Sequence, residues 1–233
     1  MALVKYGGGI TQMSGSIAGN TFARNRNGNY VRARTKPVNP NSTAQIVMRQ
    51  AVAYFTARWH EVLDSTMRNT WIAYANAVAF KNKLGETTYL SGFNMYIRYN
   101  TFRLQNGNSK ADSCLGPQAL PGKDPAYSVL AYASTNKIYV SWDADLPWTD
   151  IAASILGVYC GQPQLATRNF FAGPWKNGGP IPGNQTPPYQ MTAPYTLVTG
   201  QKIWTYARIA TGPTDGRLSE PMISSTIVAA APP

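Results

Sequence analysis

Residues 15–45 read GSIAGNTFARNRNGNYVRARTKPVNPNSTAQ. Four arginines and one lysine occur in this stretch without a single Asp or Glu, and large apolar side chains are few. Because a segment is stabilised mainly by burying apolar surface, these residues cannot form a core of their own. They must lie in solvent or against a partner of opposite charge. The stretch therefore favours docking and assembly over catalysis.

A β-hairpin is predicted at the centre of this stretch. Asn27-Gly28 is typical of a type I′ turn, in which both central residues have positive φ. The flanks, residues 20–26 and 29–36, alternate with the period of two that is typical of strands. A two-residue loop would make both faces cationic, whereas a three-residue loop would gather all the arginines on one face. The sequence leaves both registers open, and in either one residues 1–40 form an exposed basic arm.

Three helices are predicted within residues 41–105. The first follows an N-cap at Ser42 and extends to about Trp59, since apolar residues recur there at every third or fourth position. The second is expected after a cap at Asp64, and the third over about 91–105. We expect these helices to pack together as a small three-helix module.

The second half of the chain is predicted to be rich in β-structure. Residues 106–125 contain many Gly, Pro, Ser and Asn and are expected to be a linker. Beyond them the apolar pattern changes to a period of two, as in IYVSW at residues 138–142. Several such runs separated by turn signals indicate an all-β sandwich over 126–233. Residues 173–190, GPWKNGGPIPGNQTPPYQ, are expected to be a long loop within it.

The positive charge is concentrated in the first half. The chain has 233 residues and a formal net charge of +11. Up to Gln105 there are 13 basic and three acidic residues, whereas the remainder has eight basic and seven acidic residues. Such an asymmetry predicts that one module alone carries an electrostatic binding surface.

Targeting signals are absent from the sequence as given. No apolar run is long enough to span a bilayer, so we expect no membrane segment and no membrane partner. The opening MALVKYGGGI lacks the apolar core of a signal peptide, which predicts synthesis in the host cytoplasm. Cys114 and Cys160 have no flanking ligands and are expected to be reduced thiols, although a disulfide between them stays open.

The inventory of reactive residues favours a protein that is not an enzyme. There is a single histidine, His60, and neither a GxSxG nor a Walker motif occurs. Asp143, Asp145 and Asp150 form the only local acidic grouping, which we interpret as turn residues, with a weak calcium site as the alternative. We expect no catalytic residue, no cofactor and no metal site. Distant paired carboxylates for glycoside cleavage remain an open alternative.

The basic hairpin has three competing interpretations: a solvated hairpin, a site for nucleic-acid phosphates, and a dock for a protein neighbour. Docking is favoured because the Arg fork matches carboxylates and because the interleaved small residues suit strand pairing with another chain. Among partners, nucleic acid is the second choice after other proteins. The expected docking residues are Phe22, Arg24, Arg26, Tyr30, Arg32, Arg34 and Lys36.

A second surface is predicted on the sandwich. Aromatic residues in its loops are typical of surfaces that bind sugars or a host cell. The candidates are Trp148, Trp175 and Tyr189.

The C-terminal half resembles a fibronectin type III domain. The residues that carry this resemblance are Trp142, Tyr206, Arg208, Gly216, Ser219 and Pro221. The resemblance implies a fibronectin III/Ig-like β-sandwich at 126–233. The expected fold class is therefore α+β in two modules: the basic β-hairpin arm with its three-helix module, and the sandwich.

The N-terminal half resembles a family of uncharacterised tailed-phage and prophage proteins. The shared pattern lies at Gly15, Gly19, Phe22, Arg24, Asn25, Gly28, Tyr30, Arg32, Arg34, Pro37, Asn39, Pro40, Thr43, Gln45, Trp59, Trp71, Met95, Tyr96 and Arg98. The resemblance implies a virion structural protein whose partners are other virion proteins and sister copies. Capsid decoration or cement is the first expectation for its position. A place in the neck, tail or baseplate, or a DNA-associated role in the head, is the alternative.

Overall fold

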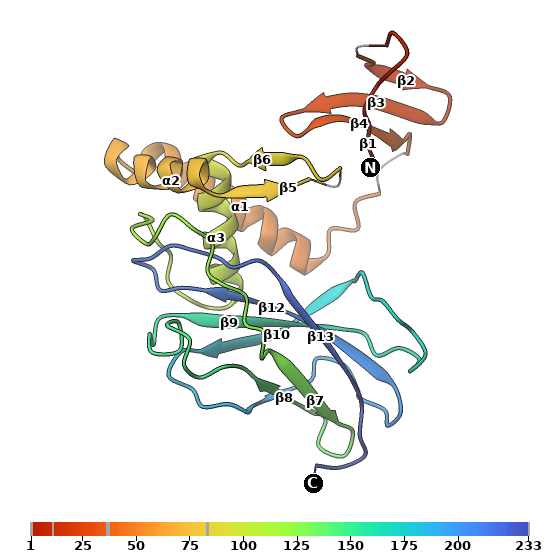
Figure 1. Ribbon diagram of the computed structural model, residues 1–233, viewed down its shortest axis with the longest axis vertical. Helices are drawn as coiled ribbons and strands as arrows, with labels where there is room; N and C mark the ends of the chain where they lie inside the picture. The colour runs from red at the N-terminus through yellow and green to blue at the C-terminus, as the bar shows by residue number, and fades with distance from the viewer. Residues whose placement is uncertain (1, 11, 36–37, 83, 233) are drawn as a thin grey trace.

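The chain folds into an α+β structure, which confirms the α+β part of the predicted fold class. The computed structural model describes residues 2–10, 12–35, 38–82 and 84–232. Within these ranges it contains three α-helices and 13 strands, and the strands form four antiparallel sheets (Figure 1). None of the helices in the described ranges is long and apolar enough to cross a bilayer.

A four-stranded sheet at the start of the chain, here called the N-terminal sheet, stands at one end of the molecule (Figure 1). Its strand order is β1-β4-β3-β2. The strands are β1 (Ala2–Leu3), β2 (Gly15–Ile17), β3 (Asn20–Asn25) and β4 (Gly28–Ala33). The predicted hairpin is thus β3-β4, and it is widened by one short strand on each side.

The turn between β3 and β4 differs from the predicted type I′ turn. The turn residues are Arg26 and Asn27, because Asn25 pairs directly with Gly28. The Asn27 amide donates to the Asn25 side-chain oxygen at 2.9 Å, and Gly28 has a φ of 113°. The Asn25 side chain therefore stabilises a local turn one residue earlier, and glycine supplies the positive φ at its end.

The three predicted helices are present, and the first two begin after the predicted caps at Ser42 and Asp64. They are α1 (Thr43–Glu61), α2 (Ser65–Ala77) and α3 (Gly92–Gln105). The side chains of Ser42, Asp64 and Ser91 each accept a hydrogen bond from the backbone amide three residues later. Such caps satisfy amide groups that a helix N-terminus leaves without partners, so the chain enters each helix where the sequence predicts.

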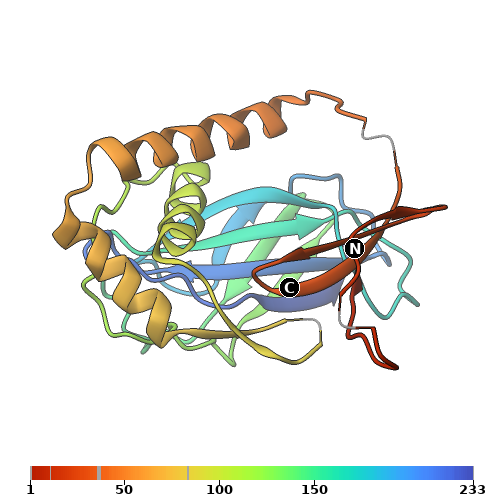
Figure 2. The ribbon, with the colours of Figure 1, turned by 90° about the horizontal axis from the view of Figure 1, so that it is seen from above.

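The helices pack through an aromatic core. Seen from above, α1 and α2 flank α3 (Figure 2). A short hairpin of β5 (Ala79–Lys81) and β6 (Thr87–Tyr89) lies between α2 and α3 in the chain. The buried aromatic residues are Phe55, Trp59, Trp71, Tyr74, Tyr96, Tyr99 and Phe102. Their ring contacts join all three helices, with Tyr96 against Phe55, Trp59 and Trp71.

The second half of the chain forms two sheets around a shared core. One sheet has the order β11-β8-β7 and the other β10-β9-β12-β13. The strands are β7 (Ser128–Tyr132), β8 (Lys137–Ser141), β9 (Ile155–Gly161), β10 (Trp175–Pro182), β11 (Tyr189–Thr192), β12 (Lys202–Ala210) and β13 (Met222–Ile227). Alternate residues such as Ile138, Val140, Val158, Ile203 and Ala207 meet in this core.

Residues 173–190 are not a long loop, so that prediction is wrong. They contain β10 and the beginning of β11. As β10 is the edge strand of its sheet, Pro180 and Pro182 interrupt no hydrogen bonds to a strand beyond it. A bulge between Asn177 and Gly179 absorbs the irregular backbone.

The predicted linker, residues 106–125, contains no helix or strand, but it packs against the helices. Ala111 and Cys114 are buried. The Trp71 indole donates to the Asp112 carbonyl oxygen at 2.9 Å, and Arg58 binds the Asp112 carboxylate through two nitrogens. This segment is therefore part of the helical core and not a free tether.

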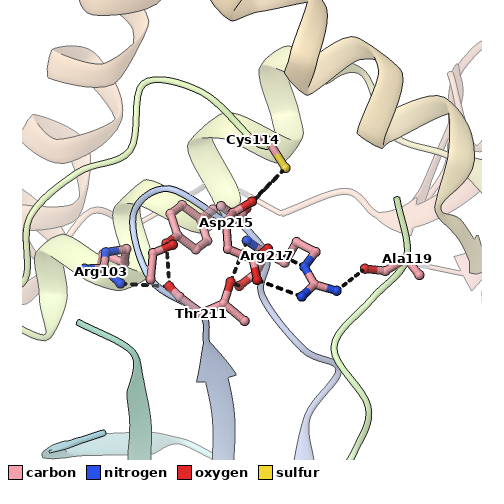
Figure 3. A network of polar contacts seen from close by, with 9 residues as sticks. Arg103, Cys114, Ala119, Thr211, Asp215 and Arg217 are labelled. Carbon is pink, nitrogen blue, oxygen red and sulfur yellow. Dashed lines mark hydrogen bonds and ion pairs between the residues drawn. The ribbon is translucent and has the colours of Figure 1, made fainter. Parts of the chain in front are cut away.

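The helices and the larger C-terminal sheet also share a hydrophobic cluster. Ile155 of β9, Ala210 of β12 and Leu218 lie in the same buried cluster as the helical aromatic residues. Polar contacts surround this junction, including Arg217 bound to the Asp215 carboxylate and the Cys114 thiol donating to the Asp215 carbonyl oxygen at 3.3 Å (Figure 3). Cys114 and Cys160 are free and buried, as expected of reduced structural thiols.

Candidate functional site

The N-terminal sheet has no core. None of its described residues is buried, and Phe22, Tyr30 and Val31 reach only partial burial. A single uncovered sheet lacks the second layer that normally stabilises β-structure. Both of its faces are therefore available to a partner.

The register distributes the arginines over both faces of this sheet. Phe22 pairs with Val31, so both lie on one face, together with Arg24 two residues further along β3. Tyr30 and Arg32 lie on the opposite face. This is the distribution expected from a two-residue loop, although the turn occupies different residues. Each face thus combines an aromatic ring with a guanidinium group.

The arginines of the sheet have no carboxylate partner among the described residues. The ion pairs recorded there are Lys5–Glu86, Arg58–Asp112, Lys123–Glu220 and Arg217–Asp215. Arg24, Arg26, Arg32 and Arg34 are exposed and take part in none of them. Lys36, the remaining predicted docking residue, lies outside the described residues. An uncompensated basic surface of this kind attracts anionic groups.

A recess on the sheet gathers two of these arginines. Arg32 and Arg34 line it with Ser16, Thr21 and Thr35, and its volume is about 320 Å³. The Ser16 and Thr21 hydroxyl oxygens lie 2.8 Å apart in a hydrogen bond. Guanidinium and hydroxyl groups at one place suit a carboxylate or a phosphate, since charged hydrogen bonds are the stronger kind.

One recorded ion pair joins the N-terminal sheet region to the β5-β6 hairpin region. Lys5 Nζ lies 2.9 Å from Glu86 Oε1, and both side chains are substantially exposed. Lys5 and Asn82 lower the pKa of the Glu86 carboxyl by hydrogen bonding to it. Because exposed pairs contribute little to stability, this contact does not fix the sheet firmly against the rest of the chain.

The three aromatic residues predicted to form a sugar-binding surface do not lie together. Trp148 is only 5% exposed and packs against Trp142 in the core between the two C-terminal sheets, so its assignment to an exposed surface is wrong. The indole turns inward because the core offers more apolar contact than solvent does. Tyr189 is partly buried on β11, in the other sheet from Trp175 of β10.

In the described part of the chain, we find no cluster of side chains suited to metal binding or acid–base catalysis. No group of three His, Cys, Asp or Glu side chains there could hold a metal ion. His60 is exposed near the end of α1. The Asp145 amide donates to the Asp143 side chain at 3.0 Å, which is a turn contact. The expectation that the protein is not an enzyme stays a prediction.

A cleft that the sequence analysis did not anticipate lies beside α3. It has a volume of about 510 Å³ and is lined by Arg98, Thr101, Phe102, Gln105, Tyr159, Trp175, Tyr206, Arg208 and Leu218. The sequence contains one signal for this cleft, which is the alternation of Trp204, Tyr206 and Arg208 along β12. It predicts one aromatic and basic face of the strand, but it does not show that α3 would close that face into a cleft.

Comparison with known proteins leaves the family of this chain open. No family model matches the sequence, and no curated protein matches it. Among solved structures, the adhesin domain of Epf from Streptococcus pyogenes is similar over 49% of this chain at 11% identity and a TM-score of 0.30. The matched part spans 34% of that chain. A likeness at this level carries no argument about function.

Proposed function

We propose that this protein is a non-enzymatic structural component of a tailed-bacteriophage virion, of the capsid decoration or cement type. It docks through the N-terminal sheet onto neighbouring virion proteins and sister copies. The observation that supports this best is the absence of any buried residue in the described part of that sheet. A single sheet whose described residues are at most partly buried needs a partner to become stable.

In this proposal the second half of the chain projects from the particle as a fibronectin III-like sandwich. The strand orders β10-β9-β12-β13 and β11-β8-β7 support the assignment, since seven strands in sheets of four and three are typical of this class of sandwich. The charge division agrees with one docked half and one solvent-facing half. Fold alone does not establish function, so the proposal rests on the docking surface.

Incorporation into particles tests the proposal. A tagged chain is expressed in the strain that carries the gene, and purified particles are analysed by mass spectrometry. A variant with Arg24, Arg26, Arg32 and Arg34 changed to Gln should lose incorporation. The control changes Lys110, Lys123, Lys137 and Lys176 to Gln, which removes the same charge from the other half. Equal incorporation of both variants, or absence of the unmodified chain from particles, would refute the docking proposal.

The position in the particle separates the alternatives within this proposal. Immunogold labelling of tagged particles should mark the capsid surface for a decoration protein. Label confined to the neck, tail or baseplate would move the protein there and refute the capsid assignment.

A DNA-associated role in the head is the second candidate function. It is favoured by the recess that combines Arg32 and Arg34 with hydroxyl groups. Several phosphate contacts would make the affinity for random duplex DNA fall steeply with salt concentration. Binding that is absent near physiological ionic strength would exclude this candidate.

A further inference from the structure

The cleft beside α3 contains two arginines without an anionic partner. Arg98 reaches it from α3 and Arg208 from β12. Neither belongs to any ion pair recorded among the described residues. Glu220, a carboxylate near enough to influence Arg98, is paired with Lys123 at 2.8 Å. The cleft therefore concentrates positive charge that the described part of the chain does not neutralise.

The Arg98 guanidinium is held in place by its surroundings. Arg98 donates to the carbonyl oxygens of Leu218 at 3.1 Å and Ser219 at 3.2 Å. Burial, reinforced by the neighbouring Arg208 charge, lowers the pKa of Arg98 to about 10. The Arg208 Nε atom is buried and has no hydrogen-bond partner in the described structure. A buried donor without a partner is costly, so the Arg208 side chain is left unsatisfied within the described structure.

Aromatic rings form the wall next to these arginines. The ring centroids of Tyr206 and Trp175 lie 5.6 Å apart, and those of Tyr206 and Tyr159 lie 5.7 Å apart. The Arg208 guanidinium lies over the Tyr206 ring, 5.4 Å from its centroid. All three rings are partly exposed on the outer face of the sheet. They offer a broad apolar platform directly beside the charged end of the cleft.

We propose that this cleft binds the acidic sugar unit of a glycan. The carboxylate of the sugar is bound by Arg98 and Arg208, and the apolar face of its ring packs on Tyr206 and Trp175. The volume of about 510 Å³ is in the range of small-ligand sites. A guanidinium group matches a carboxylate in geometry as well as charge. The cleft is separate from the N-terminal sheet, so this inference does not depend on the docking proposal.

The arrangement favours a single acidic group over a nucleic-acid strand. A strand would need basic side chains spaced along a groove and ring faces that stack successive bases. Here the two guanidinium groups converge on one cleft. The rings meet at angles, with 72° between Tyr159 and Tyr206 and 35° between Trp175 and Tyr206. They therefore present no series of parallel faces.

Calorimetric titration of the full chain tests the inference. The acidic probes are tetragalacturonate and sialyllactose, and their neutral counterparts are methyl-esterified tetragalacturonate and lactose. At least one acidic probe should bind, and its neutral counterpart should bind more weakly by about tenfold or more, as expected for a lost charged hydrogen bond. Failure of all the acidic probes, or equal binding of the neutral ones, overturns the proposal. Binding of octathymidylate in their place, if it is weakened in Arg208→Gln, assigns the cleft to nucleic acid and also overturns the proposal.

Two variants locate the bound probe. Arg208→Gln and Trp175→Ala should each weaken binding by about tenfold or more, and titration of Trp fluorescence should show a change that is lost in Trp175→Ala. Lys137→Gln on the opposite sheet is the matched control and should bind as the unmodified chain does. Thermal unfolding verifies that each variant is folded. If folded Arg208→Gln and Trp175→Ala proteins bind normally, the sugar is bound elsewhere and the assignment fails.

Discussion

The Arg103 guanidinium donates a hydrogen bond to the Thr211 carbonyl oxygen across the junction between α3 and the chain after β12, at 3.0 Å (Figure 3). Arg103 is only 1% exposed. It also donates to the carbonyl oxygens of Ala153 at 3.0 Å and Ser109 at 2.6 Å. One buried cation thus connects three separate segments through backbone carbonyl groups, which are strong acceptors.

Replacing Arg103 with Met should therefore destabilise the protein. Met retains much of the volume but donates no hydrogen bond, so three carbonyl groups lose their charged donor. We expect a loss of about 3 kcal/mol in the free energy of unfolding, measured by urea denaturation. Lys110→Met, at an exposed position, should change it by less than about 0.5 kcal/mol. Equal values for the two variants would show that Arg103 does not stabilise the junction.

Gly157 should tolerate no side chain. A Cβ atom at this position of β9 would overlap with Cζ of Phe102 and lie 3.1 Å from Nδ2 of Asn106. Gly157→Ala should destabilise the protein by about 1–3 kcal/mol, because the Phe102 ring or the whole of α3 must shift to make room. Phe102→Leu combined with Gly157→Ala should recover part of this loss in thermal unfolding.

Gly122→Ala is the control for this prediction. No atom lies within 4 Å of the Cβ that it would introduce. Its melting temperature should therefore stay close to that of the unmodified chain. A similar loss of stability at both glycines would argue against close packing as the cause at Gly157.

Alkaline conditions should unfold the protein through its buried tyrosines. Burial raises the pKa of Tyr74, Tyr96, Tyr99 and Tyr127 well above the ordinary value of 10.0. The unfolded chain then loses phenolic protons that the folded chain keeps, so stability is unaffected below about pH 10 and falls as the pH rises beyond it. Phenolate absorbance should rise in two phases, the second together with loss of ellipticity. A single smooth titration of all the tyrosines in the folded chain would contradict this.

Limited trypsin digestion should remove the N-terminal sheet first. Its described residues are not buried, and Arg26 lies exposed in the β3-β4 turn. Segments with little buried surface open at low cost in free energy and are cleaved early. Mass spectrometry should show early cleavage after Arg26, while bonds after the buried Arg103 persist. Simultaneous cleavage at both residues would show that the sheet is as stable as the rest of the chain.

The local signals in the sequence were sufficient for the helices. Ser42, Asp64 and Ser91 each cap the helix that the apolar spacing predicts. Caps and helical periodicity involve residues within one or two turns of each other, so they can be recognised in the sequence without a tertiary structure. The positions of β8, β9 and β12 were predictable for the same reason, because a period of two reflects one buried face.

Two of the predictions that failed depended on distant neighbours. β10 forms despite its Gly and Pro because β9 offers it an edge for pairing. Trp148 is buried because Trp142 and the sandwich core surround it. The error in the β3-β4 turn has a local cause. The Asn25 side chain stabilises a turn one residue earlier than the turn that Asn27-Gly28 predicts.

The sequence by itself determined the three helices, the strand-forming character of the second half and the concentration of positive charge in the first. These properties follow from composition and short-range periodicity. Only the tertiary structure decided that the N-terminal sheet is left without a core and that Arg98 and Arg208 meet beside the same aromatic wall. Their meeting depends on the packing of α3 against β12. The spacing of apolar residues within one segment does not show which distant segment will pack against it.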